Sequence, residues 1–83
     1  MRAFPDVAAV HAEVLRVLGL VLEIDPPESV LVRETCPEWD SLKHVQIVFA
    51  LEDAFGVAFS LEELAELNDS GTITRHVADR LGA

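Results

Sequence analysis

The sequence predicts an all-α bundle of three longer helices and one short helix, with a long loop after the first helix. Apolar residues recur at three- and four-residue spacings, capping residues precede these segments, and prolines or glycines interrupt them. A chain of 83 residues is the size of one domain, so we expect a single domain over residues 1–83. Its hydrophobic fraction of 51% and charged fraction of 25% are typical of a folded globular protein.

The first predicted helix follows Asp6, because aspartate is a favourable N-cap residue. Apolar residues then recur along one face at Val7, Val10, Val14, Val17, Leu18 and Val21. We expect this helix to fray at Gly19 and to have ended before Pro26 and Pro27, since glycine and proline disfavour helix. A loop without clear periodicity then leads to Asp40.

The second helix is predicted over residues 41–55, because Gly56 suits the left-handed position that follows a helix. A wheel with about 100° per residue places two apolar arcs on this helix. The broader arc is expected to face the core and contains Ile47, Val48, Leu51, Ala54 and Phe55. The second arc continues from Ser41 and contains Leu42, Val45 and Phe49.

The third helix is predicted to be short, from Leu61 to about Asn68. Ser60 and Glu63 have the spacing of a capping box at its start. The flanking positions of a hydrophobic staple are occupied by Phe59 and Leu64.

The fourth helix is predicted to follow a polar turn over residues 68–71, with Thr72 as its cap. Its apolar face carries Ile73, Val77 and Leu81. The predicted core combines one face from each helix: Val14, Leu18, Ile47, Leu51, Phe55, Phe59, Leu64, Ile73, Val77 and Leu81.

The composition excludes several classes of partner. A net charge of -9 repels phosphate backbones and anionic lipid, so we expect no nucleic acid and no membrane partner. The single cysteine, Cys36, cannot form an internal disulfide, and we see no secretory signal, so we expect a cytoplasmic monomer. We expect no metal site, because the acidic residues match no calcium loop and His11 and His76 are expected at the surface.

The second arc of helix 41–55 is a candidate docking surface. If it is exposed, Leu42, Val45 and Phe49 face water or a partner protein. The charges of Glu52 and Asp53, in or near this arc, favour exposure because unpaired carboxylates are rarely buried. The alternative is a central helix that is buried nearly all round.

The segment Trp39-Asp40-Ser41-Leu42, with the helix that follows it, resembles the attachment segment of acyl carrier proteins. The resemblance includes the long loop before the serine, the paired acids Glu52 and Asp53, and the order of the last two helices. It covers essentially the whole chain. The fold that it implies is an acyl-carrier-like four-helix bundle.

The resemblance implies a non-catalytic carrier. A phosphopantetheinyl transferase would attach phosphopantetheine from coenzyme A to Ser41 through a phosphodiester, and the thiol of this arm would bear an acyl group as a thioester. Asp40 would cap the helix and Leu42 would follow the attachment residue. The implied partners are the transferase, an acyl-loading enzyme (acyltransferase or acyl ligase), and downstream synthase or tailoring enzymes.

The chain departs from the family in two places. Many carriers of fatty acid biosynthesis have acidic residues along the first turns of this helix, whereas Lys43, His44 and Gln46 stand here. Because charge complementarity selects partners, we expect a polyketide or other specialised pathway. Peptide-synthetase carriers usually have two glycines before the serine, where this chain has Glu38-Trp39-Asp40. This favours an acyl carrier and leaves an aminoacyl or peptidyl carrier open.

Two further hypotheses belong to other classes. An unmodified helical adaptor would use only the second arc to bind a partner. A hydrolase would use Ser41 as nucleophile, with His44 as base and Asp40 nearby. We discount the hydrolase, because the sequence has no Gly-x-Ser-x-Gly elbow and indicates no oxyanion hole, and we therefore expect no catalytic residue.

Overall fold

The computed structural model describes residues 6–82, and within this range the regular elements are helices. They are α1 (Val7–Leu22), the 3-10 turn η1 (Arg33–Thr35), α2 (Ser41–Phe55), α3 (Leu61–Leu64) and α4 (Ser70–Leu81). The predicted all-α bundle is confirmed. The outermost residues of the predicted 1–83 domain, including the amino-terminal segment searched for a secretory signal, lie outside the described residues.

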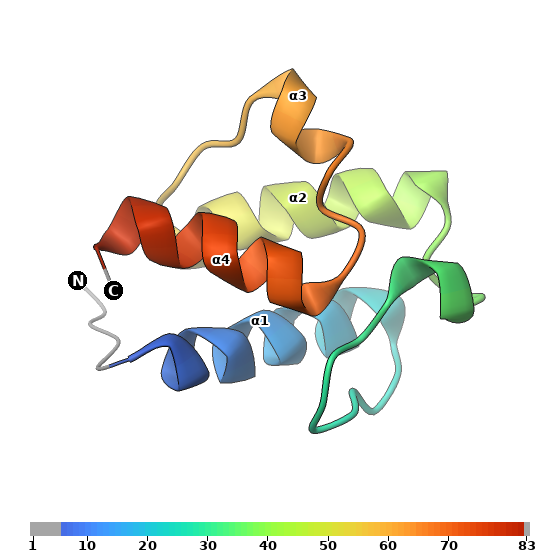
Figure 1. Ribbon diagram of the computed structural model, residues 1–83. Helices are drawn as coiled ribbons and strands as arrows, with labels where there is room; N and C mark the ends of the chain where they lie inside the picture. The colour runs from blue at the N-terminus through green and yellow to red at the C-terminus, as the bar shows by residue number, and fades with distance from the viewer. Residues whose placement is uncertain (1–5, 83) are drawn as a thin grey trace.

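The core lies where α1 packs against both α2 and α4 (Figure 1). The fully buried apolar side chains come from these three helices and from the segment after α3: Val10, Val14, Leu18, Ile47, Leu51, Leu67, Ile73 and Val77. The short α3 lies on the other side of the bundle from α1 (Figure 1). It contributes no buried residue, so the core depends on the three longer helices.

Most of the predicted core is confirmed, with three differences. Phe59 and Leu64 are partly buried and pack against the core from its edge. Leu81 is 37% exposed, so its prediction as a core residue is wrong. It is the last residue of α4, where the helix ends at the left-handed Gly82.

The first helix does not fray at Gly19, contrary to the sequence-based expectation. It continues to Leu22, and Glu23 closes it in the left-handed conformation, with its N–H donating to the Gly19 carbonyl. Gly19 is buried where the following loop crosses the helix. A Cβ at this position would lie 2.8 Å from Pro26 Cδ, so the missing side chain lets the loop turn back against α1.

The last two helices also begin or end differently from the prediction. The cap of α4 is Asp69 and not Thr72, because the Asp69 carboxylate accepts hydrogen bonds from both the N–H and the hydroxyl of Thr72. α3 ends at Leu64 because the next backbone bonds tighten: the N–H of Leu67 donates to the carbonyl of Leu64, three residues earlier. This turn brings Leu67 into the core.

The long loop between α1 and α2 is tied to the start of α4. Ser70 is fully buried, and its hydroxyl accepts a hydrogen bond from the Leu31 N–H at 2.9 Å. Its own N–H donates to the Leu31 carbonyl at 2.8 Å. The Arg33 N–H donates to the Asn68 carbonyl at 2.9 Å. These bonds fix the path of the loop before it reaches Asp40.

The short α3 is held mainly by polar contacts. The Ser60 and Glu63 capping box is confirmed, with both of its hydrogen bonds present. The Glu63 carboxylate also pairs with Arg80 and His76 of α4. The Ser60 backbone N–H, followed by the Arg80 guanidinium, lowers the pKa of Glu63 from 4.5 to about 2.

The Glu63 carboxylate should make the stability of the fold depend on acidity. Its pKa is lower in the folded than in the unfolded chain, so its contribution is complete above pH 4.5 and is lost as the pH falls towards about 2. We expect Glu63→Gln to lower the melting temperature at neutral pH, and the difference from the native chain to shrink across that window. Thermal unfolding, monitored by circular dichroism at each pH, measures this difference in melting temperature.

The matched control is Glu62→Gln, which changes an exposed carboxylate in the same turn of α3. The melting temperature of Glu62→Gln should stay close to that of the native chain over the whole pH range. A difference in melting temperature between Glu63→Gln and the native chain that stays constant from neutral pH down to about pH 2 would contradict the proposed role of the charge.

Candidate functional site

The start of α2 is fixed by Asp40, as predicted. Asp40 has an extended backbone, and its Oδ1 accepts a hydrogen bond from the Lys43 N–H at 2.9 Å. Its carbonyl accepts the first bond of the helix, from the His44 N–H at 2.9 Å. A side-chain N-cap of this kind contributes about 1 kcal/mol to helix stability. The cap makes Ser41 the first residue of α2.

The Ser41 side chain is exposed at this helix start. Within residues 6–82, its hydroxyl makes no hydrogen bond, unlike those of Ser60 and Ser70, which cap α3 and tie down the loop. The N–H groups of Ser41 and Leu42 also lack partners in this range, as expected in the first turn of a helix. They lie at the positive end of the helix dipole. The site therefore offers an accessible hydroxyl beside N–H groups that suit an anion.

Two buried rings lie behind this helix start. Trp39 is 3% exposed and His44 is 8% exposed. The Trp39 indole Nε1–H donates to His44 Nδ1 at 3.0 Å, and the rings stack with centroids 6.1 Å apart. His44 Nε2 lies 2.8 Å from the Leu64 carbonyl oxygen at the end of α3. The two rings thus connect the loop before Ser41, α2 and α3.

His44, one of the three residues that stand where many carriers have acids, is buried. Both of its ring nitrogens are occupied, by Trp39 and Leu64, so neither is free to take a proton from Ser41. This removes the base from the hydrolase hypothesis. The sequence contained a signal for this burial, because His44 precedes Ile47 by three residues and Leu51 by seven, which places it on the core-facing arc.

Lys43 also turns away from the candidate docking surface. It is half-buried, and its amine donates to the Val21 carbonyl at 3.3 Å, near the end of α1. A cation there complements the negative end of the α1 dipole. Three residues, Lys43, His44 and Gln46, distinguish this segment from acidic carriers, and of these only Gln46 is exposed. The sequence pattern did not reveal the Lys43 contact.

The second arc of α2 is exposed, which rules out a helix that is buried all round. Leu42 is 67% exposed, Val45 43% and Phe49 64%. We call these three residues the α2 stripe. Asp53 is exposed, whereas Glu52 is half-buried and its Oε2 accepts a hydrogen bond from the Phe59 N–H at 2.8 Å. A docking role for these residues stays a prediction.

Cys36 is a buried loop residue, and its thiol lies 3.5 Å from a Glu38 carboxylate oxygen. Burial, followed by this carboxylate, raises the pKa of the thiol, which keeps it protonated and weakly reactive. No cluster of His, Cys, Asp and Glu in residues 6–82 could hold a metal ion. No helix of that range is both long and apolar enough to cross a membrane.

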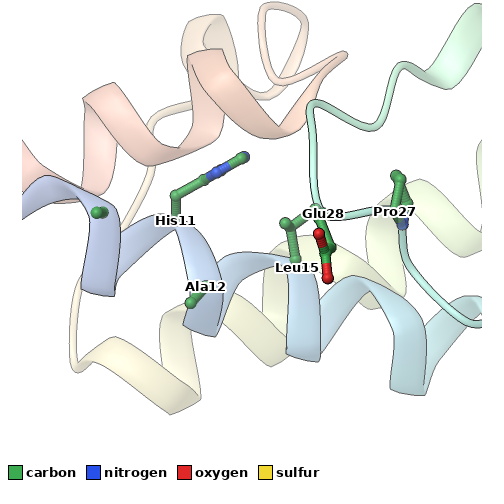
Figure 2. A pocket seen from close by; sticks show the side chains of 6 residues that line it. His11, Ala12, Leu15, Pro27 and Glu28 are labelled. Carbon is green, nitrogen blue, oxygen red and sulfur yellow. The ribbon is translucent and has the colours of Figure 1, made fainter.

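Two open hollows lie away from the Ser41 hydroxyl. One is lined by Arg33, Glu34, Trp39 and Asn68. The other lies between α1 and the loop that follows it, where Figure 2 shows His11, Leu15 and Glu28 among its lining side chains. His11 points from α1 towards α4, and its Nε2 lies 2.9 Å from the Ser70 hydroxyl (Figure 2). Ser41 lines neither of these hollows.

The fold and the helix order define an acyl-carrier-like helical bundle. The chain is 32% identical over 79 residues to a curated protein from Helicobacter pylori named acyl carrier protein, and the alignment covers 95% of each chain. This chain therefore belongs to the acyl carrier protein family. No family model matches the sequence. No solved structure matches it either.

Proposed function

We propose that this protein carries acyl groups as thioesters on a phosphopantetheine arm attached to Ser41. The observation that carries the proposal is an exposed serine hydroxyl, free of hydrogen bonds within residues 6–82, at the capped start of a long helix. Membership of the acyl carrier protein family supports the same function. The chain would not catalyse a reaction itself. It would be the substrate of a phosphopantetheinyl transferase, an acyl-loading enzyme, and synthase or tailoring enzymes.

The residues at the start of α2 fit a phosphodiester. The free N–H groups of Ser41 and Leu42 can donate to its oxygens, and the helix dipole adds roughly 0.3–1 kcal/mol at an exposed site. Asp40 keeps this geometry by holding the Lys43 N–H. The arm supplies the thiol that binds the acyl group. The chain supplies a rigid attachment point that stands clear of its core.

The α2 stripe is proposed as the surface that partner enzymes contact. It begins beside Ser41, so an enzyme that binds Leu42, Val45 and Phe49 also reaches the attachment residue. An exposed carboxylate follows it on the same helix at Asp53, four residues after Phe49. Because Lys43 is engaged by α1, the exposed charge near the stripe is mainly negative. This arrangement suits an enzyme surface with an apolar hollow and a basic rim.

A specialised pathway, such as polyketide biosynthesis, is proposed over general fatty acid biosynthesis. Its support is that no acidic residue occurs between Asp40 and Glu52. The region is not strongly basic either, because His44 is buried and the Lys43 amine contacts α1. Partners would therefore recognise the first turns of α2 mainly through apolar contacts.

Replacement of the attachment residue tests the carrier function. Incubation of the native chain with coenzyme A and a broad-specificity phosphopantetheinyl transferase should add one phosphopantetheinyl group, seen by intact-mass spectrometry. Ser41→Ala should abolish the gain without changing the helical circular dichroism spectrum, because the Ser41 hydroxyl makes no hydrogen bond within residues 6–82. Ser29→Ala, which changes an exposed loop serine, should be modified like the native chain.

An unchanged mass for the folded native chain would reject the proposal. It would leave the unmodified adaptor, which the exposed α2 stripe also supports. An adaptor would bind its partner equally well with serine or alanine at position 41.

Truncation of the α2 stripe tests docking. Phe49→Ala should lower kcat/KM for phosphopantetheinylation by about tenfold or more, equivalent to about 1.4 kcal/mol, because an exposed aromatic anchor is lost. The matched control is Leu20→Ala, which truncates an apolar residue that is 66% exposed on α1. Equal rates for the native chain and both variants would show that the transferase does not use the stripe.

A further inference from the structure

The hydrogen bonds of His44 join three segments that are separated in the sequence. On one side the imidazole accepts from Trp39, in the loop before Ser41, and on the other it contacts the carbonyl of Leu64, at the end of α3. We call this chain of two hydrogen bonds the His44 relay. Its two rings, Trp39 and His44, are buried and Leu64 is partly buried, whereas the neighbouring Ser41 and Leu42 are exposed.

The chemistry of the relay fixes the position of one proton. An indole N–H can only donate, so His44 Nδ1 must accept the bond from Trp39. A neutral imidazole that accepts at Nδ1 carries its proton on Nε2, which then donates to the Leu64 carbonyl. Each bond of the relay therefore favours the tautomer that the other requires. By accepting the hydrogen bond from Nε2–H, the Leu64 carbonyl of α3 keeps Nδ1 free to accept the bond from Trp39. It thereby helps to hold Trp39 in place.

The relay matters for α3 because this helix has little other attachment to α2. It has four residues and none of them is buried. Glu63 ties it to α4 through Arg80 and His76. The bond from His44 holds its last residue, Leu64. Displacement of Leu64 would leave His44 Nε2 without its acceptor.

The relay also matters for Ser41 because Trp39 lies two residues before it. The buried indole anchors the backbone that enters α2, and the N-cap Asp40 stands between the anchor and the attachment residue. If Nδ1 acquired the proton, two N–H groups would face each other and the Trp39 anchor would be lost. The loop before Ser41 would then loosen.

We propose that His44 is a positioning residue whose tautomer couples the docking of α3 to the presentation of Ser41. The proposal rests on the function proposed above for Ser41 and adds a regulatory link to it. With α3 docked, Leu64 holds the proton on Nε2 and Trp39 fixes the start of α2. A partner or cargo that displaces α3 removes this constraint and loosens the segment that a modifying enzyme must bind.

The native chain tests the first requirement. Long-range ¹H–¹⁵N NMR should show His44 as the neutral tautomer with its proton on Nε2. A proton on Nδ1, or rapid exchange between the two tautomers, would overturn the proposal whatever the outcome for Ser41.

Trp39 provides a specific probe of the coupling, because it is the only tryptophan and the chain has no tyrosine. Ser60→Ala removes the cap of α3 without touching the relay. We expect this change to shift Trp39 fluorescence to longer wavelength. In a His44→Asn background the shift should disappear, because the asparagine carbonyl accepts from Trp39 but cannot reach Leu64 or change tautomer.

An equal shift in both backgrounds, or no shift in the native one, would overturn the coupling. If His44→Asn did not fold by circular dichroism, His44→Gln would replace it. Its amide can donate to Leu64 but leaves Trp39 without an acceptor. The Trp39 fluorescence of His44→Gln should then already lie at longer wavelength, and adding Ser60→Ala should shift it no further. A further shift as large as that in the native background would contradict the proposal.

Phosphopantetheinylation kinetics separate positioning from general stability. His44→Gln should raise KM severalfold with kcat nearly unchanged, because a loosened segment must be ordered on binding. Val14→Ala, which creates a cavity in the core beside α1, should leave KM and kcat unchanged as long as the chain is folded. Equal effects of the two variants would assign His44 to stability alone. If the native chain were not modified, the function proposed for Ser41 would fail, and the fluorescence experiment would still test the coupling.

Discussion

The start of α2 is the constraint on which the site depends. Asp40 caps the helix from outside and Trp39 anchors the preceding backbone from within, so the chain can enter the helix in one way. The core contacts of Ile47 and Leu51 then set the rotation of α2. With one face buried, the opposite face must carry Ser41 and the α2 stripe into solvent. The exposure of the attachment residue and the exposure of the proposed docking surface are therefore consequences of the same packing.

The sequence predicted those parts of the structure that depend on local pattern. The caps at Asp6, Asp40 and Ser60 and the exposed arc of α2 follow from spacing and side-chain chemistry, and the structure confirms each of them. Local pattern was insufficient at Gly19, where the helix continues and the absent side chain leaves room for Pro26. That contact is created by the returning loop.

The errors in the site have a similar cause. The hydrolase hypothesis placed His44 beside Ser41 as a base, but its position on the wheel belongs to the core and its partners satisfy it there. One of those partners is the Leu64 carbonyl, twenty residues away, which no periodicity identifies. The Lys43 contact with α1 likewise depends on how two helices cross. On α2, side-chain exposure could be predicted from spacing, whereas long-range polar partners could not.

The proposed function requires that the hydroxyl at the start of α2 carries the cargo of this protein. The direct measurement is fragmentation mass spectrometry of the chain purified from its natural source, which assigns any attached group to one residue. We predict a phosphopantetheine arm on Ser41, with acylated forms among the molecules. An arm on Ser29 or Ser60, or a chain that carries none, would contradict it.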